Sequence, residues 1–262
     1  MNHRMEKNRL VMRASPDWLN FDIEKTRPFL ASFRLPETLI IDFDALWRRH
    51  FRDDYRTIRA RLKALAVQTY NDVRQASFVH HADWHPDEPL DGWISFLDDD
   101  DWMSPALFES LPAPQPRDDG ALWGSLRLGR VFAANGYAES LFQFRALDRT
   151  VYTNNYAVTA PALQRLGWKS LFEHDGAQTT FDRADFRYIT SSQYLSCAVK
   201  HPCCTMSINY LMNHECFRAD PRREMTKFME ALEAVSLDEL AEWLKRPFQQ
   251  FQAIMADVIP IA

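Results

Sequence analysis

The sequence predicts an α/β protein built on one main mixed sheet, with helices on its flanks and at its C-terminal end. Short apolar runs with β-branched centres alternate along the chain with longer segments of helical periodicity. Strands and helices are mixed from the start, which is the order of an α/β domain. The 262 residues are enough for one domain that buries roughly 70–75% of its unfolded surface without disulfides or metals.

The first half of the chain is predicted to contain three strands and two helices. Short apolar runs predict strands at 9–13, 37–43 and 93–97. Apolar residues at helical spacing predict a long amphipathic helix over 53–73. A serine followed by a proline predicts the start of a short helix over 104–111.

Basic residues are interleaved along the helix predicted at 53–73. They are Arg56, Arg59, Arg61 and Lys63. Two interpretations are open: a solvated helix face, or a partial counterweight to a bound phosphate.

The second half begins with a loop and ends in helices. The segment 112–120 is rich in proline and ends in Asp-Asp-Gly, the strongest loop signal in the chain. Beyond it, the predicted elements are strands at 129–133, 140–144 and 151–152 and helices at 159–166, 221–234 and 236–243. Cap residues mark the helix that ends at Gly167 and the helix that starts at Ser236. We expect Trp243, Phe248 and Phe251 to pack on the core, with docking on a partner or a membrane surface as the alternative.

Composition excludes several classes of function. The chain has 31 Lys and Arg against 36 Asp and Glu, so it lacks the overall basic excess of a nucleic-acid-binding protein. No run approaches the roughly 18 apolar residues of a membrane span, and the first residues lack the apolar core of a signal peptide. We therefore expect a cytoplasmic protein with at most peripheral membrane contact. With 7 glycines and no GxGxxG or GxxxxGK motif, glycine-rich phosphate loops are excluded.

Four consecutive aspartates, 98–101, follow the strand predicted at 93–97. Like charges a few ångströms apart repel each other and raise each other's pKa values, so the cluster requires a cation. Ligands of open α/β sheets bind at the carboxyl ends of strands, and Mn²⁺ or Mg²⁺ prefer carboxylate and phosphate oxygens. The sequence predicts such a metal site, with a solvent-exposed acidic turn beside a helix N-terminus as the alternative.

The segment 94–105, Ile-Ser-Phe-Leu-Asp-Asp-Asp-Asp-Trp-Met-Ser-Pro, resembles the DxD signature of GT-A-type nucleotide-sugar glycosyltransferases, including rhamnosyltransferase-like bacterial proteins. In this resemblance Asp98 is the first aspartate of the motif, near the ribose and the metal, and Asp100 is the metal-binding aspartate. Asp101 is the acidic residue that follows, and Asp99, at the variable position, is assigned to the nucleotide side. The resemblance implies metal-assisted transfer of a sugar from a nucleotide diphosphate donor to a glycan or lipid-linked acceptor, with Mn²⁺ or Mg²⁺ as the cofactor.

The same resemblance implies one GT-A-like, Rossmann-like domain over 1–262. Residues 1–111 then form a nucleotide-binding half that ends in the DxD, and residues 120–262 form an acceptor half with the C-terminal helices. Arg13 is assigned to the nucleotide.

Further site residues follow from the resemblance by their order in the chain. Glu173 or Asp175 is the candidate catalytic base that removes the proton of an acceptor hydroxyl. His201 is the candidate that completes the metal site, and His174 competes with it. Asn154 and Asn155 lie in a Tyr-Thr-Asn-Asn-Tyr segment whose amides and rings suit sugar binding. The alternative for that segment is a polar strand end.

Two other clusters define rival functions. His80, His81, Asp83 and His85 would serve a metal-dependent hydrolase or phosphotransferase that uses them together with the aspartates. A zinc-stabilised binding protein would draw on the cysteines Cys197, Cys203, Cys204 and Cys216 and on the histidines His201 and His214. Their spacing matches no CxxC pair, and a buried free cysteine is the alternative.

Overall fold

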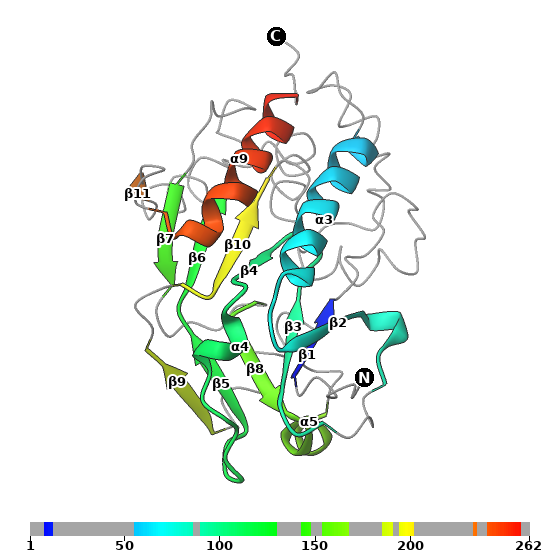
Figure 1. Cartoon of the computed structure of the whole chain (residues 1–262), viewed down its shortest axis with the longest axis vertical. Helices are drawn as coiled ribbons and strands as arrows, with labels where there is room; N and C mark the ends of the chain where they lie inside the picture. The colour runs from blue at the N-terminus through cyan, green and yellow to red at the C-terminus, as the bar shows by residue number, and fades with distance from the viewer. Residues whose placement is uncertain are drawn as a thin grey trace, which may run out of the picture.

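The computed structural model of the chain contains two sheets and a pair of long helices (Figure 1). The structure describes residues 8–12, 55–85, 90–129, 143–147, 154–167, 185–190, 194–201, 233–234 and 240–257. Strands and helices are mixed along these ranges, so the predicted α/β class is confirmed. No helix within them is long and apolar enough to cross a membrane.

The larger sheet has six strands in the order β2-β1-β3-β8-β5-β9. Its strands are β1 (Asn8–Met12), β2 (Ala76–His80), β3 (Trp93–Leu97), β5 (Gly120–Trp123), β8 (Tyr156–Thr159) and β9 (Phe186–Ile189). Strand β1 is parallel to β2 and β3, whereas β8 is antiparallel to β3 and β5. The carboxyl ends of β1, β2 and β3 therefore meet at one end of a mixed sheet, where open α/β sheets bind ligands.

A second sheet has five strands in the order β11-β7-β6-β10-β4. Its strands are β4 (Trp102–Met103), β6 (Ser125–Gly129), β7 (Gln143–Leu147), β10 (Ser196–Lys200) and β11 (Glu233–Ala234). Strand β10 pairs with β6 in parallel and with β4 in antiparallel orientation. Since β3 belongs to the first sheet and β4 to the second, the aspartates 98–101 form the link between the sheets.

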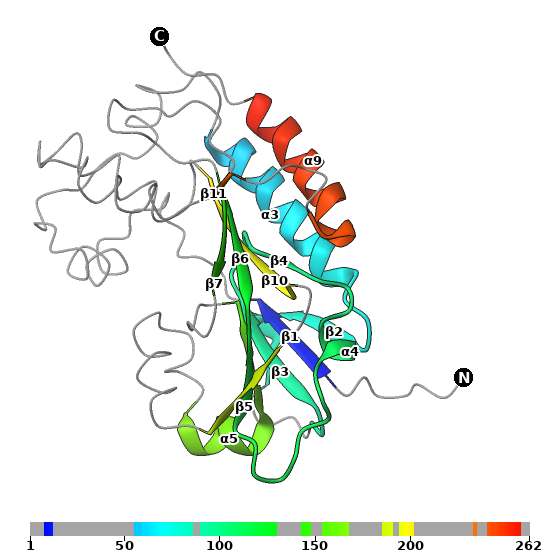
Figure 2. The same ribbon diagram turned by 90° about the vertical axis from the view of Figure 1, so that its left-hand side faces the viewer.

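Two long helices lie side by side on one face of the sheets (Figure 2). The helices within the described ranges are α3 (Tyr55–Asn71), α4 (Leu107–Ser110), α5 (Ala160–Leu166) and α9 (Glu242–Ala256), with a short 3-10 helix η2 (His81–Asp83). Helix α9 buries Leu244, Phe248 and Phe251, whose spacing of four and three residues puts them on one face.

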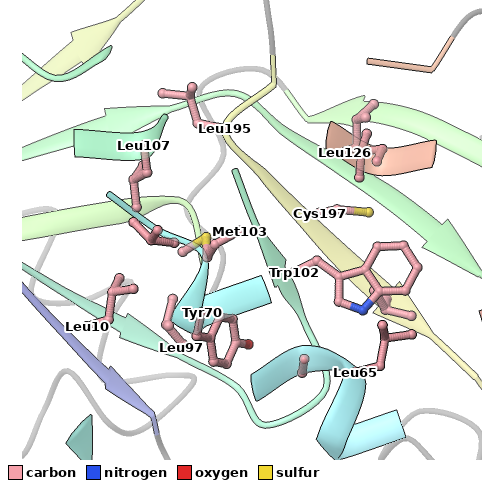
Figure 3. Packing of buried hydrophobic residues seen from close by; sticks show 14 of the residues in the cluster. Leu10, Leu65, Tyr70, Leu97, Trp102, Met103, Leu107, Leu126, Leu195 and Cys197 are labelled. Atoms are coloured by element: carbon pink, nitrogen blue, oxygen red, sulfur yellow. The ribbon is translucent and has the colours of Figure 1, made fainter. Parts of the chain in front are cut away.

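The main hydrophobic core joins these helices to the strand that follows the aspartates. Trp102 of β4 is 1% exposed, and its ring meets Phe251 edge to face, with centroids 5.8 Å apart. Leu65 and Tyr70 of α3 lie around the same strand (Figure 3). The prediction that Phe248, Phe251 and Trp243 pack on the core is confirmed, because the first two are buried and Trp243 packs against the cluster.

Several predicted elements are found nearly residue for residue. The strands predicted at 9–13 and 93–97 are β1 and β3, and the helix predicted at 53–73 is α3. Helix α5 has the predicted caps at both ends. Thr159 Oγ1 accepts a hydrogen bond from Ala162 N at 3.3 Å, and Gly167, with φ of 83°, ends the helix.

Two helix boundaries were predicted wrongly. The helix expected from residue 104 starts at Leu107, because Ser104 Oγ accepts from Ala106 N in a turn that precedes it. Of the helix expected over 236–243, residues 236–239 lie outside the described residues, and residues 240 and 241 are not helical. Ala241 is the N-cap of α9, which starts at Glu242 and continues through Pro247.

Strand predictions in the second half are shifted. Of the strand predicted at 129–133 only Gly129 is described, and it is the last residue of β6. Of the strand predicted at 140–144 only residues 143 and 144 are described, and they begin β7. Glu233 and Ala234, predicted as the end of a helix, form β11, because they pair with β7. The segments 37–43, 151–152 and 221–232 lie outside the described residues.

Asp118 and Asp119 connect the proline-rich loop before β5 to neighbouring elements by hydrogen bonds. Asp118 accepts two hydrogen bonds from the Arg187 guanidinium, and Asp119 accepts from the Arg165 side chain and from the Asp185 amide. Partial burial raises the pKa of Asp119, but these two hydrogen bonds and the Arg165 charge outweigh it and hold the pKa below its usual value. The loop is thereby joined to α5 and β9.

Replacing Gly120 by alanine will destabilise the protein. A Cβ at Gly120 would lie 2.6 Å from the Ala157 carbonyl oxygen and would overlap the Phe186 ring, so β5 would be pushed away from both neighbours. We expect a loss of about 1–3 kcal/mol in the free energy of unfolding, measured by urea denaturation. Gly124→Ala is the matched control, because its Cβ would meet the Tyr188 hydroxyl at an ordinary 3.6 Å. Equal stability of the two variants would contradict the close packing at Gly120.

Candidate metal site

The four aspartates form a turn between β3 and β4, here called the acidic turn (Asp98–Asp101). All five residues of β3 are buried, so the charges begin where the strand leaves the core. Asp99 and Asp101 are 4% and 1% exposed, whereas Asp98 and Asp100 are half-buried. The turn is thus built into the protein and is not a freely solvated acidic run.

Three of the four carboxylates converge. Asp98, Asp100 and Asp101 each offer one oxygen, and these oxygens lie within 4.8 Å of one another. In the part of the chain that the structure describes, no other group of three His, Cys, Asp or Glu side chains could hold a metal ion. A donor set made of carboxylate oxygens fits a hard divalent cation such as Mg²⁺ or Mn²⁺.

Asp99 stands apart from this group and pairs with α3. Its Oδ2 lies 3.8 Å from the Arg59 guanidinium and 3.7 Å from the Lys63 ammonium. A third basic residue of the helix, Arg61, pairs with Asp257 at the end of α9. These three basic side chains therefore bind carboxylates of the protein itself, which neither interpretation of the basic helix had anticipated.

Tyr70 of α3 contacts the backbone of the acidic turn. Its hydroxyl donates a hydrogen bond to the backbone carbonyl of Asp98. Burial, followed by the charges of the four aspartates, holds the pKa of Tyr70 well above its usual value. The phenol therefore stays protonated and remains a donor.

His201 lies where the sequence analysis placed it, beside the aspartates. It follows β10, is 1% exposed, and its Nε2 is 3.1 Å from Asp100 Oδ2. The structure brings the two side chains together, and a direct role of His201 in metal binding stays a prediction.

Asn154 and Asn155 are both 0% exposed. The Asn154 amide donates to Asp101 at 2.8 Å, and the Asn155 amide donates to the Trp123 carbonyl at 2.9 Å. Their amides are thus hydrogen-bonded inside the protein, so sugar binding by these residues stays a prediction that their burial does not favour.

Some of the remaining predicted site residues lie outside the described residues, and the others form no metal-binding group. Arg13, Glu173, His174 and Asp175 lie outside the described residues. The cluster of His80, His81, Asp83 and His85 does not gather into a metal-binding group, and the His80 ring instead packs against Phe78 at 5.2 Å.

Of the four cysteines in the zinc hypothesis, only Cys197 lies within the described residues. Cys197 is 0% exposed and part of the hydrophobic core (Figure 3). The other members of that cluster, Cys203, Cys204, Cys216 and His214, are outside the described residues. Cys197 therefore behaves as a small apolar core residue.

Apart from His201, sequence reasoning did not identify which side chains and backbone groups contact the acidic turn. Tyr70 and Lys63 lie on a helix that was predicted, but no local pattern indicates what a helix face contacts. Val199, which donates its backbone N–H to Asp101 at 2.9 Å, acts through its place in β10 and not through its side chain.

The fold and the acidic turn define this chain as an α/β protein with a candidate metal site of three aspartates. Comparison with known proteins adds no family to this: no family model matches the chain, and no curated protein matches it.

Proposed function

We propose that this chain is a metal-dependent glycosyltransferase of the GT-A type. It would transfer a sugar from a nucleotide diphosphate donor to a glycan or lipid-linked acceptor. The observation that carries the proposal is the convergence of Asp98, Asp100 and Asp101 at the carboxyl end of β3. A mixed α/β sheet binds its ligand at this position, and the resemblance to the DxD signature falls on the same residues.

The charges of the turn favour a divalent cation. Arg59 and Lys63 compensate Asp99, which leaves three carboxylates close together. Binding of Mn²⁺ or Mg²⁺ offsets most of their mutual repulsion. When bound, such an ion supplies the positive charge that a departing diphosphate needs.

Each residue then has a distinct task. Asp98 and Asp100 would hold the ion, with His201 beside Asp100. Tyr70 keeps the Asp98 backbone in place through its hydrogen bond. Glu173 or Asp175 remains the proposed base for the acceptor hydroxyl, which must lose its proton as the new glycosidic bond forms.

The test is calorimetric titration of the full chain with UDP, GDP, dTDP and CDP, with Mn²⁺ and again with EDTA. We expect one nucleoside diphosphate to bind in Mn²⁺, because the ion connects its phosphates to the carboxylates, and to lose its binding in EDTA. If none of the four binds in the presence of Mn²⁺, the proposed function is wrong. Binding that survives in EDTA would also contradict it, because the phosphates would then be held without the aspartates.

A further inference from the structure

We propose that Asn154 is a positioning residue of the candidate metal site, which fixes the Asp101 carboxylate beside Asp98 and Asp100. The proposal rests on the metal site of the proposed function. It assigns to Asn154 a task different from the sugar binding that its sequence pattern indicates. Two features carry it, which are how Asp101 is held and how Asn154 is held, and the neutrality of Asn154 and Val199 fits the role.

Each oxygen of the Asp101 carboxylate is held from a different sheet. Oδ2 accepts from Asn154 Nδ2 at 2.8 Å, and Asn154 lies just before β8 of the six-stranded sheet. Oδ1 accepts from the Val199 N–H at 2.9 Å, in β10 of the five-stranded sheet. Because Asp101 is 1% exposed, bulk water does not compete for these bonds. The carboxylate is therefore fixed at the junction of the two sheets.

The Asn154 amide is itself held in one orientation. Its Oδ1 lies 3.3 Å from Ser125 Oγ, a hydroxyl whose single proton is also within hydrogen-bond distance of the Leu126 and Ser196 carbonyls. A carboxylate accepts hydrogen bonds and does not donate them, so the Nδ2 end must face Asp101 and the Oδ1 end must face Ser125. Ser125 begins β6 and pairs with Ser196 of β10. The contact thus ties Asn154 to the same sheet that supplies Val199.

Asn154 and Val199 both hold Asp101 as neutral donors. An amide and a backbone N–H favour the ionised carboxylate, and neither of these two groups carries a charge that would cancel its own. Asp99 shows the opposite arrangement, since cationic Arg59 and Lys63 compensate its charge. Hydrogen-bond partners that orient metal ligands in this way typically change metal affinity by about 10–100-fold when they are removed.

The test is the affinity for Mn²⁺ alone, measured by calorimetry and by electron paramagnetic resonance of free Mn²⁺. Asn154→Ala is compared with wild type and with Asn155→Ala. Asn155 is the matched control because it is the next residue, is equally buried and donates to the Trp123 carbonyl, away from the acidic turn. We expect Asn154→Ala to weaken Mn²⁺ binding by about 10–100-fold and Asn155→Ala by less than about threefold.

Each outcome decides between the proposals. Equal Mn²⁺ affinity of the two variants overturns the positioning role and leaves the proposed function untouched. A wild-type chain that binds no Mn²⁺ overturns both. A loss confined to Asn154→Ala supports the positioning role even where no nucleoside diphosphate binds, in which case the proposed function alone is wrong.

A second variant keeps the test available if Asn154→Ala does not fold. Ser125→Ala removes the hydroxyl that lies beside Asn154 Oδ1 and leaves the amide itself in place. Weaker Mn²⁺ binding than in Asn155→Ala supports the role, and equal binding overturns it.

Discussion

Asp100→Asn will lower the affinity of the full chain for Mn²⁺ by at least about 100-fold. Removing a residue that only hydrogen-bonds to a metal ligand lowers metal affinity by up to about 100-fold, and changing the ligand itself should cost at least as much. The substitution keeps the shape of the side chain but removes the charge that a hard cation requires. Asparagine still offers an oxygen toward His201, so the contact at 3.1 Å is preserved. The loss therefore reports on ligation and not on the packing of the turn. Calorimetric titration with Mn²⁺ measures it.

The matched control is Asp99→Asn, which removes the same charge from the same turn. Asp99 pairs with Arg59 and Lys63 and is not one of the three converging carboxylates. Its loss acts on the cation through longer-range attraction, so we expect less than about a tenfold change. If both variants lose Mn²⁺ equally, the net charge of the turn and not ligation by Asp100 determines binding, and the candidate site is wrong.

Elements set by local chemistry could be predicted from the sequence. Four apolar residues and one serine, bounded by Gly92 and an aspartate, define β3, because consecutive residues determine both its burial and its ends. Helix α5 carries its own N-cap in Thr159 and its stop in Gly167. No distant contact is needed to place either element.

Elements that depend on tertiary contacts could not be predicted from the sequence. Strand β4 is two residues long and exists because β10, almost a hundred residues away, pairs with it. Helix α9 runs through Pro247, a residue that normally breaks a helix by removing an N–H and crowding the preceding turn. Its apolar face, packed on α3 and the core, outweighs that local preference.

The candidate site also has a part that could be predicted from the sequence and a part that could not. Its carboxylates could be predicted because they are consecutive, and their repulsion indicates a cation whatever the fold. Their partners are remote: Asn154 is 53 positions from Asp101, and His201 is 101 positions from Asp100. The resemblance, and not any residue pattern, pointed to His201. No feature of the sequence indicates that Arg59 and Lys63 pair with Asp99.

Phe251→Ala will lower the free energy of unfolding by about 3–5 kcal/mol, the cost of truncating a fully buried aromatic ring. Phe251 is 0% exposed and meets the Trp102 ring edge to face. Its removal opens a cavity between α9 and β4. Strand β4 cannot easily move to fill this cavity, because it is hydrogen-bonded to β10. In a chain of this size the loss corresponds to a melting temperature lower by roughly 6–20 °C. Urea and thermal denaturation followed by circular dichroism measure both.

Gln249→Ala on the same helix is the control, because Gln249 is exposed and an exposed substitution of this kind stays within about 0.5 kcal/mol. The difference in the free energy of unfolding between the two variants measures the effect of burial, because both place alanine in the same helix. If Phe251→Ala costs no more than Gln249→Ala, then α9 does not belong to the core. Trp102 would then lack the ring that covers it, and the acidic turn, which ends one residue before Trp102, would lose part of the packing that keeps its carboxylates together.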